Sequence, residues 1–261
     1  MLSLIISSLT VQVFAQDSDS TTVLHKAIVT SADSTKSNFY LSGSALLTNN
    51  GINLVPTFSL NKPAAMFKFF AGNRLTFEPE FNFSLEGKPW YFIFWIRYKL
   101  IQTEKFRLST AGQYGLNYLE TDVLINGNTV KGIVAQRYLA LDIAPSYQLT
   151  KNLGVGIYYL HSHGVDPGTT NSLDFLTLNA TWNIEIAKMF QFTIAPQLYY
   201  LHQDDRHGTY ITTAFNIQKK RLPLALSFII NQPLKTDIAG GQDFVWNVSL
   251  VYLFEVIHPK K

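Results

Sequence analysis

The sequence predicts one all-β domain, a membrane-embedded, closed, antiparallel up-and-down β-barrel of about twelve strands. Three observations lead to this fold class. The chain is 47% hydrophobic but only 15% charged, whereas soluble domains carry about 25% charged residues. Beyond the N-terminus, no apolar run approaches the roughly 20 residues that a spanning helix needs. Several segments instead alternate apolar and polar residues over strand-like lengths. A closed barrel is then the remaining way to cross a bilayer.

The alternation is clearest between Leu75 and Leu85. Successive side chains of a strand point to opposite faces, so such a pattern gives one apolar face and one polar face. The pattern recurs over 190–203 and 244–254. In the first segment the apolar positions are Leu75, Phe77, Pro79, Phe81, Phe83 and Leu85, and the polar positions are Thr76, Glu78, Glu80, Asn82 and Ser84. These lengths exceed the usual five or six residues of a soluble strand.

Twelve strands are predicted, within a range of ten to fourteen. They cover residues 38–48, 52–61, 74–85, 90–102, 105–119, 133–149, 152–163, 172–187, 190–203, 209–219, 222–232 and 243–256. Tight turns alternate with longer polar connections such as 120–132, as in barrels whose periplasmic turns are short. Residues 61–74 are ambiguous. Because a bacterial barrel has an even number of strands, we interpret them as a kinked continuation of strand 52–61 or as an interfacial excursion.

The chain ends divide into segments of different character. Residues 1–15 are apolar and end in Val13-Phe14-Ala15, which predicts a signal peptide cleaved before Gln16. No Lys or Arg precedes its apolar core, which points to a true start codon further upstream. Residues 16–37 are polar and predict a flexible periplasmic tail. The barrel then covers 38–257, with a short tail at 258–261. An even strand number places both termini in the periplasm.

The last strand carries a resemblance to a known family. Val251-Tyr252-Leu253-Phe254 ends in aromatic residues and resembles the terminal strand of Gram-negative outer-membrane β-barrel proteins, although Glu255–Lys261 follow it. Gln16 and the Tyr/Phe/Asn-rich composition are similar to small barrels of the Bacteroidota; no subfamily is identified. The resemblance implies an integral outer-membrane protein in contact with lipid and lipopolysaccharide. It also implies that Trp246, Tyr252 and Phe254 form an assembly signal, read by the barrel-insertion machinery.

Charged residues are expected on the inner face of the predicted barrel. They are Glu78, Glu80, Arg97, Lys99, Arg107, Asp142 and Glu185. One interpretation is a selective constriction for ions or solutes. The other is a salt-bridge network that fills the lumen, because enclosed charges must be paired. We favour the network, since a twelve-strand barrel lies between filled eight-strand barrels and water-filled porins.

The favoured function is a structural or protein-interaction role in the envelope, with other envelope proteins as partners. The alternative is a narrow channel for small solutes or ions, and the third is a hydrolase at the rim. Asp205-Arg206-His207 resembles the Asp-x-His element of omptin-type proteases but lacks their facing acidic pair. His161 and His163 could share a metal with Asp166, although a rim pair is favoured. We therefore expect no catalytic residues, metal or cofactor. The net charge of +3 is too small to indicate nucleic-acid binding.

Overall fold

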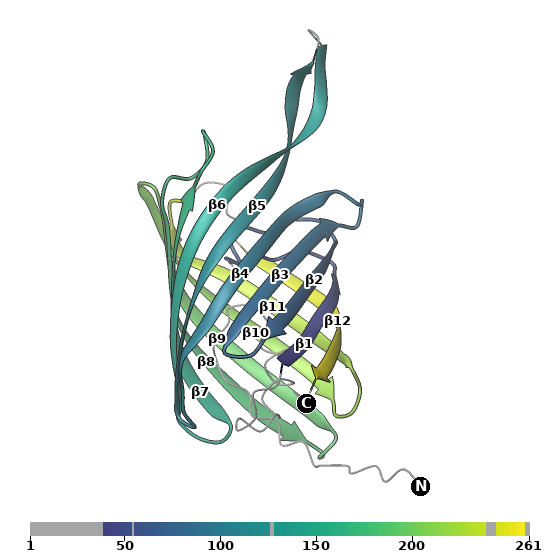
Figure 1. Cartoon of the computed structure of the whole chain (residues 1–261), viewed down its shortest axis with the longest axis vertical. Coiled ribbons are helices and arrows are strands. Elements are labelled where there is room, and N and C mark those ends of the chain that lie inside the picture. Colours follow the sequence, from purple (N-terminus) through teal and green to yellow (C-terminus); the bar gives the residue numbers. More distant parts are fainter. Residues whose placement is uncertain (1–38, 54, 126–127, 239–243, 259–261) are drawn as a thin grey trace.

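The structure is a computed structural model that describes residues 39–53, 55–125, 128–238 and 244–258. It is a closed barrel in which each strand pairs antiparallel with its neighbour in sequence and the last strand pairs with the first (Figure 1). The predicted fold class and the count of twelve strands are confirmed. The predicted signal peptide and N-terminal tail, together with residues 259–261, lie outside the described residues, whereas His258 belongs to the last strand.

The strand bounds are close to those predicted over most of the chain. The strands are β1 (Phe39–Thr48), β2 (Ala64–Gly72), β3 (Leu75–Ser84), β4 (Pro89–Gln102), β5 (Phe106–Ile125), β6 (Asn128–Gln148), β7 (Leu153–Gly164), β8 (Leu173–Ile186), β9 (Phe190–Gln203), β10 (Arg206–Lys219), β11 (Leu224–Thr236) and β12 (Val245–His258). Phe39 pairs with His258, so β1 begins and β12 ends at the same rim. No helix among the described residues is long and apolar enough to cross a membrane.

Side-chain exposure follows the alternation that the sequence predicts. On β3, Asn82 is fully buried while Phe77 is 45% exposed. Aromatic side chains cover the outer face of β2–β4, where Phe81 and Phe92 meet edge to face with ring centroids 5.3 Å apart. The apolar face therefore points outward and the polar face inward, the arrangement expected when lipid surrounds the barrel and polar groups line its lumen.

The second strand lies at β2 and not at residues 52–61, so the prediction for these two segments was wrong. In the connection from β1 to β2, the described residues 49–53 and 55–63 contain one isolated bridge, between Ile52 and Ser59. Pro56 lacks an N–H group and disfavours a central strand. In β2, Lys68 interrupts an apolar run, but it faces inward and pairs with Glu80. Parity excluded one of the two segments, and the structure shows that the one excluded should have been 52–61.

A second correction concerns residues 120–132, which were predicted to be a polar loop. β5 and β6 pair along their whole length up to Ile125 and Asn128. The resulting hairpin projects well beyond the rest of the barrel (Figure 1). The sequence Asn126-Gly127 between the two strands is a strong hairpin signal. The charged residues Glu120, Asp122 and Lys131 nevertheless make the segment resemble a polar loop in sequence.

A β-bulge changes the predicted orientation of Trp90. The β3–β4 register shifts between Asn82 and Phe83, so that Phe83 pairs with Pro89. Strict alternation along β4 would place Trp90 on the outer face with Phe92 and Phe94. Instead it packs against the buried core cluster of the lumen, next to Gly51. Simple alternation fails at a bulge because one strand carries an extra residue.

At the seam where the last strand pairs with the first, an aromatic side chain packs on a glycine. Phe254 of β12 lies over Gly43 of β1, where an added Cβ would stand 2.5 Å from the Phe254 ring and 2.4 Å from the Lys68 carbonyl oxygen. Trp246 and Tyr252 are exposed on the outer face. The role of these three aromatic residues as an assembly signal stays a prediction.

Gly43→Ala should therefore destabilise the barrel by about 1–3 kcal/mol, the usual cost of overpacking. Urea unfolding of the refolded protein, followed by tryptophan fluorescence, measures this. Gly112→Ala is a matched control, because its Cβ would meet nothing closer than a Leu141 methyl group at 3.7 Å. Equal stability of the two variants would contradict the prediction.

Candidate functional site

The candidate site is the lumen, whose walls differ in chemistry. The wall formed by β2–β4 and β6 carries buried charges. The wall formed by β8–β11 carries buried amides and hydroxyls, and the segment 49–63 folds in from one rim. Figure 1 shows that these strands lie on separate parts of the barrel.

Arg97 stands at the centre of the charged wall. Its Nε lies 3.2 Å from a Glu78 carboxylate oxygen, and its Nη1 lies 3.1 Å from Asp142. Arg97 and Asp142 lie on β4 and β6, and both pair in register with Ala111 of β5 between them. The methyl side chain of Ala111 lets the guanidinium cross that strand. The Tyr158 hydroxyl donates a further hydrogen bond to Asp142, 3.2 Å away.

A second ion pair joins β2 to β3. Lys68 and Glu80 are direct cross-strand partners, with 3.3 Å between Nζ and Oε2. The Tyr91 hydroxyl and the Asn82 amide donate to the same carboxylate at 2.8 and 3.0 Å. These side chains are nearly inaccessible to solvent, so the carboxylate is held by hydrogen bonds from three strands. Lys68 was missed from the sequence because β2 was not recognised as a strand.

The structure brings together four of the seven charged residues named from the sequence: Glu78, Glu80, Arg97 and Asp142. Lys99 and Arg107 are half-buried, and Lys99 lies within electrostatic range of Glu78, Arg97 and Arg107. Glu185 does not belong to this cluster. It is exposed and pairs with Lys220 at 2.9 Å. At this position β8 has reached the rim where the tight turns and both chain ends lie, here called the short-turn rim.

The connection from β1 to β2, described at residues 49–53 and 55–63, is here called the in-folded segment. Ile52, Val55 and Thr57 are buried. The segment closes on itself, because Leu60 N–H donates to the Gly51 carbonyl at 2.8 Å. It is attached to β12, where Asn247 donates to the Asn50 carbonyl at 3.2 Å.

The apolar residues of this segment pack against two parts of the wall. Ile52 forms a small cluster with Ile229 of β11 and Val245 of β12. Val55 joins the larger core cluster, which contains the stacked rings of Tyr199 and Tyr210 with centroids 4.8 Å apart. The segment is therefore part of the packed interior, and it narrows the lumen from the rim opposite the chain ends.

Amides and hydroxyls on β8–β11 form two rows, here called the upper and lower amide rows. Each member is the register partner of the next around the wall. The upper row is Asn179, Gln197, Thr212 and Asn231. The lower row is Asn183, Thr193, Asn216 and Ser227. Cross-strand neighbours lie about 4.8 Å apart, so each row is a continuous polar band.

Much of the hydrogen-bonding capacity of these rows is unused. Asn231 accepts from the Tyr199 hydroxyl at 2.8 Å, and Asn183 accepts from Thr193 at 2.9 Å. Seven other buried atoms have no hydrogen-bond partner among the described residues: Asn179 Oδ1, Asn183 Nδ2, Gln197 Nε2, Asn216 Nδ2 and Oδ1, Ser227 Oγ and Asn231 Nδ2. A buried polar group left unpaired costs about 1–3 kcal/mol. The rows are therefore suited to contact with water or a solute and not to dry packing.

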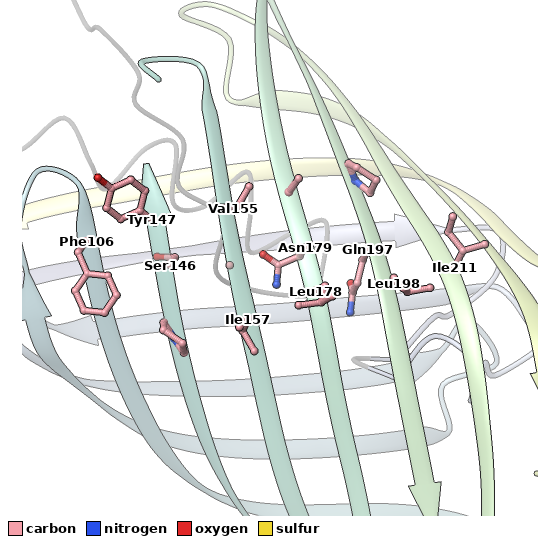
Figure 2. Close-up of a pocket in the computed structure, with 14 residues that line it drawn as sticks. Phe106, Ser146, Tyr147, Val155, Ile157, Leu178, Asn179, Gln197, Leu198 and Ile211 are labelled. Carbon is pink, nitrogen blue, oxygen red and sulfur yellow. The ribbon is translucent and has the colours of Figure 1, made fainter. Parts of the chain in front are cut away.

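An open groove of about 580 Å³ runs over β5–β10, mostly on the outer face of the barrel, and reaches Asn179 and Gln197 of the upper row. Figure 2 shows Asn179 and Gln197 side by side on neighbouring strands, with Leu178, Leu198 and Ile157 nearby. These three apolar residues are exposed on the outer face. Residues of both faces thus line the groove, and most of them belong to the outer face. The wall here also contains Pro145 and Pro196. Each proline lacks a backbone N–H group, so it cannot donate a hydrogen bond to the neighbouring strand.

The histidines considered for a metal or catalytic site lie at the rim. His161 Nδ1 lies 2.8 Å from Asp174, and His202 shares the same carboxylate at 3.4 Å. Asp166, considered with His161 for a metal, pairs instead with Arg137. That guanidinium holds the pKa of Asp166 below its ordinary value. His207, of the Asp205-Arg206-His207 element, faces Asp237 at 3.9 Å. Within the described ranges, no group of three or more His, Cys, Asp or Glu side chains is placed to hold a metal ion.

Comparison with known proteins supports the fold. No family model matches the chain, and no curated protein matches it. Several solved structures, however, match the chain. An outer-membrane channel from Pseudomonas putida F1 is 10% identical, with a TM-score of 0.50, over 85% of this chain and 97% of that one. The KdgM porin in complex with disordered oligogalacturonate is 11% identical, with a TM-score of 0.49, over 82% of this chain and 99% of that one. The NanC porin is 14% identical, with a TM-score of 0.48, over 85% of this chain and 100% of that one. The closed barrel thus has the fold of the Pseudomonas outer-membrane channel.

Proposed function

We propose that this barrel is a narrow channel for small polar solutes across the outer membrane. The short-turn rim and both chain ends would face the periplasm, and the in-folded segment would lie at the external mouth. The observation that carries the proposal is the pair of amide rows with unpartnered buried atoms. The sequence favoured a structural role, on the ground that inward charges would fill the lumen. The charges do pair with one another, but they occupy one wall and leave the amide wall without such partners.

The test is conductance of the refolded full chain in a planar lipid bilayer. Discrete, long-lived current steps are expected, because a hydrated polar band provides a path for ions in an otherwise apolar membrane. Protein unfolded by heat and added in the same detergent is the control. Insertion without current, verified by heat-modifiable migration of the recovered protein, would contradict the channel.

The second candidate is the interaction role expected from the sequence. The projecting β5–β6 hairpin (Figure 1) supports it, because Leu119, Val130, Ile133 and Val134 are exposed. They lie beyond the last pairs with β4 and β7, where β5 and β6 pair only with each other. Exposed apolar groups that rise beyond the other strands mark a contact surface for another protein. A silent but folded barrel in the bilayer experiment would leave this role as the better one.

A further inference from the structure

The amide rows carry both donors and acceptors, and none of their side chains is charged. The free donors are amide nitrogens of Asn183, Gln197, Asn216 and Asn231, and the free acceptors are amide oxygens of Asn179 and Asn216. All four donor residues are more than nine-tenths buried. A ligand that satisfies this set must accept and donate several hydrogen bonds at once.

We infer that the amide rows bind an uncharged, polyhydroxylated solute of the sugar or sugar-alcohol class, which rests on the proposed channel function. A hydroxyl group donates one hydrogen bond and accepts two, so a chain of hydroxyls matches alternating amide donors and acceptors. A carboxylate or phosphate only accepts, and it would leave the oxygens of Asn179 and Asn216 without a donor.

The charged wall does not change this assignment. Lys68 and Arg97 are engaged with Glu80, Glu78 and Asp142. A charged solute would have to compete with these buried pairs and shed its own water, which is costly in a confined lumen. A neutral solute exchanges hydrogen bonds with water for hydrogen bonds with amides, at little electrostatic cost.

The separation of the two rows suits an extended ligand. The upper and lower rows are four residues apart along each strand, which is about 13 Å at 3.3 Å per residue. Between them lie the register partners Ala195, Ala214 and Ile229. The small side chains of the two alanines form a strip between the rows, and a solute lying along its β9 part can reach amides at both ends. Ile52 of the in-folded segment packs in the Ile229 cluster, against which Ala214 also packs, and therefore covers the β10–β11 part of this strip.

The experiment has two readouts on the full chain. Maltotriose is titrated into bilayers that hold wild-type channels, and the same sugar is added to detergent-solubilised protein during thermal unfolding. Saturable reduction of the current and a rise in Tm are expected, because a ligand that binds only the folded state stabilises it. Sodium gluconate, also hydroxyl-rich but charged, should block more weakly.

The matched variants separate binding from folding. Asn216→Leu with Asn231→Leu should raise the half-blocking concentration about tenfold, as expected for the loss of two hydrogen-bonding side chains. Ser44→Val, at a buried lumen position of β1 outside the rows, should leave it unchanged. If the double variant does not fold, the single Asn216→Leu variant replaces it.

The outcomes distinguish this inference from the channel itself. A conducting wild-type channel that maltotriose neither blocks nor stabilises would mean that the rows hold water only, which overturns the inference and leaves the proposed function standing. Equal block in wild type and double variant would place the sugar elsewhere and also overturn it. A protein without current would remove the proposed function, and with it this inference.

Discussion

Arg97→Met is expected to destabilise the barrel by about 3–5 kcal/mol, the range for breaking a buried ion pair by removing one partner. Arg97 is 8% exposed and faces two carboxylates. Methionine has a similar length and no charge, so Glu78 and Asp142 would remain buried with their principal counter-charge removed. Urea unfolding of the refolded variant, with tryptophan fluorescence as the signal, measures the loss.

A triple variant separates charge from packing. Arg97→Met combined with Glu78→Gln and Asp142→Asn removes the carboxylates as well, and replacing a whole buried ion cluster by neutral groups is often nearly neutral for stability. We expect it to recover most of the loss. A loss below about 1 kcal/mol in the single variant, the range of exposed ion pairs, would instead show that water reaches this wall.

This cluster shows what alternation in one strand reveals and what it leaves out. The polar face of β3 assigns Glu78 and Glu80 to the lumen from sequence, because the side-chain period of a strand is two residues. Their partners cannot be assigned in this way. Asp142 meets Arg97 only because β5 places Ala111 between them. Such cross-strand register depends on turns and bulges along the whole barrel.

The in-folded segment shows a different limit. Ile52, Val55 and Phe58 are apolar, and apolar residues inside a barrel connection resemble a membrane strand when only hydrophobicity is read. Strand parity correctly required that 52–61 and 64–72 not both be strands, but it did not say which one to reject. The decision rests on Lys68, whose partner Glu80 is visible only once β2 and β3 are paired.

The amide rows were partly predictable. The alternation over 190–203 places Gln191, Thr193 and Gln197 on the polar face of one strand. What the sequence does not show is that Gln197 and Thr212 become neighbours of Asn179 and Asn231. A row that runs across strands has no signature along the chain.

Replacing residues 52–59 by a two-residue Asn-Gly turn is expected to increase single-channel conductance severalfold. Gly51 and Leu60 already meet through a 2.8 Å hydrogen bond, and Asn-Gly is the preferred two-residue hairpin turn. The replacement therefore shortens the connection without moving β1 or β2. It removes Ile52, Val55 and Thr57 from the lumen, where all three are buried.

The control is a second shortened connection on the same rim. Trimming the β5–β6 hairpin between Thr121 and Lys131 removes paired residues that project beyond the barrel (Figure 1). Its conductance should equal that of wild type, because these residues line no part of the described lumen. If the two shortened proteins conduct alike, the in-folded segment does not narrow the conducting path. An increase confined to the 52–59 replacement would assign the constriction to the segment that packs on Ile229 and Val245. Conduction through the barrel would then be set by that packing and not by the paired charges on the opposite wall.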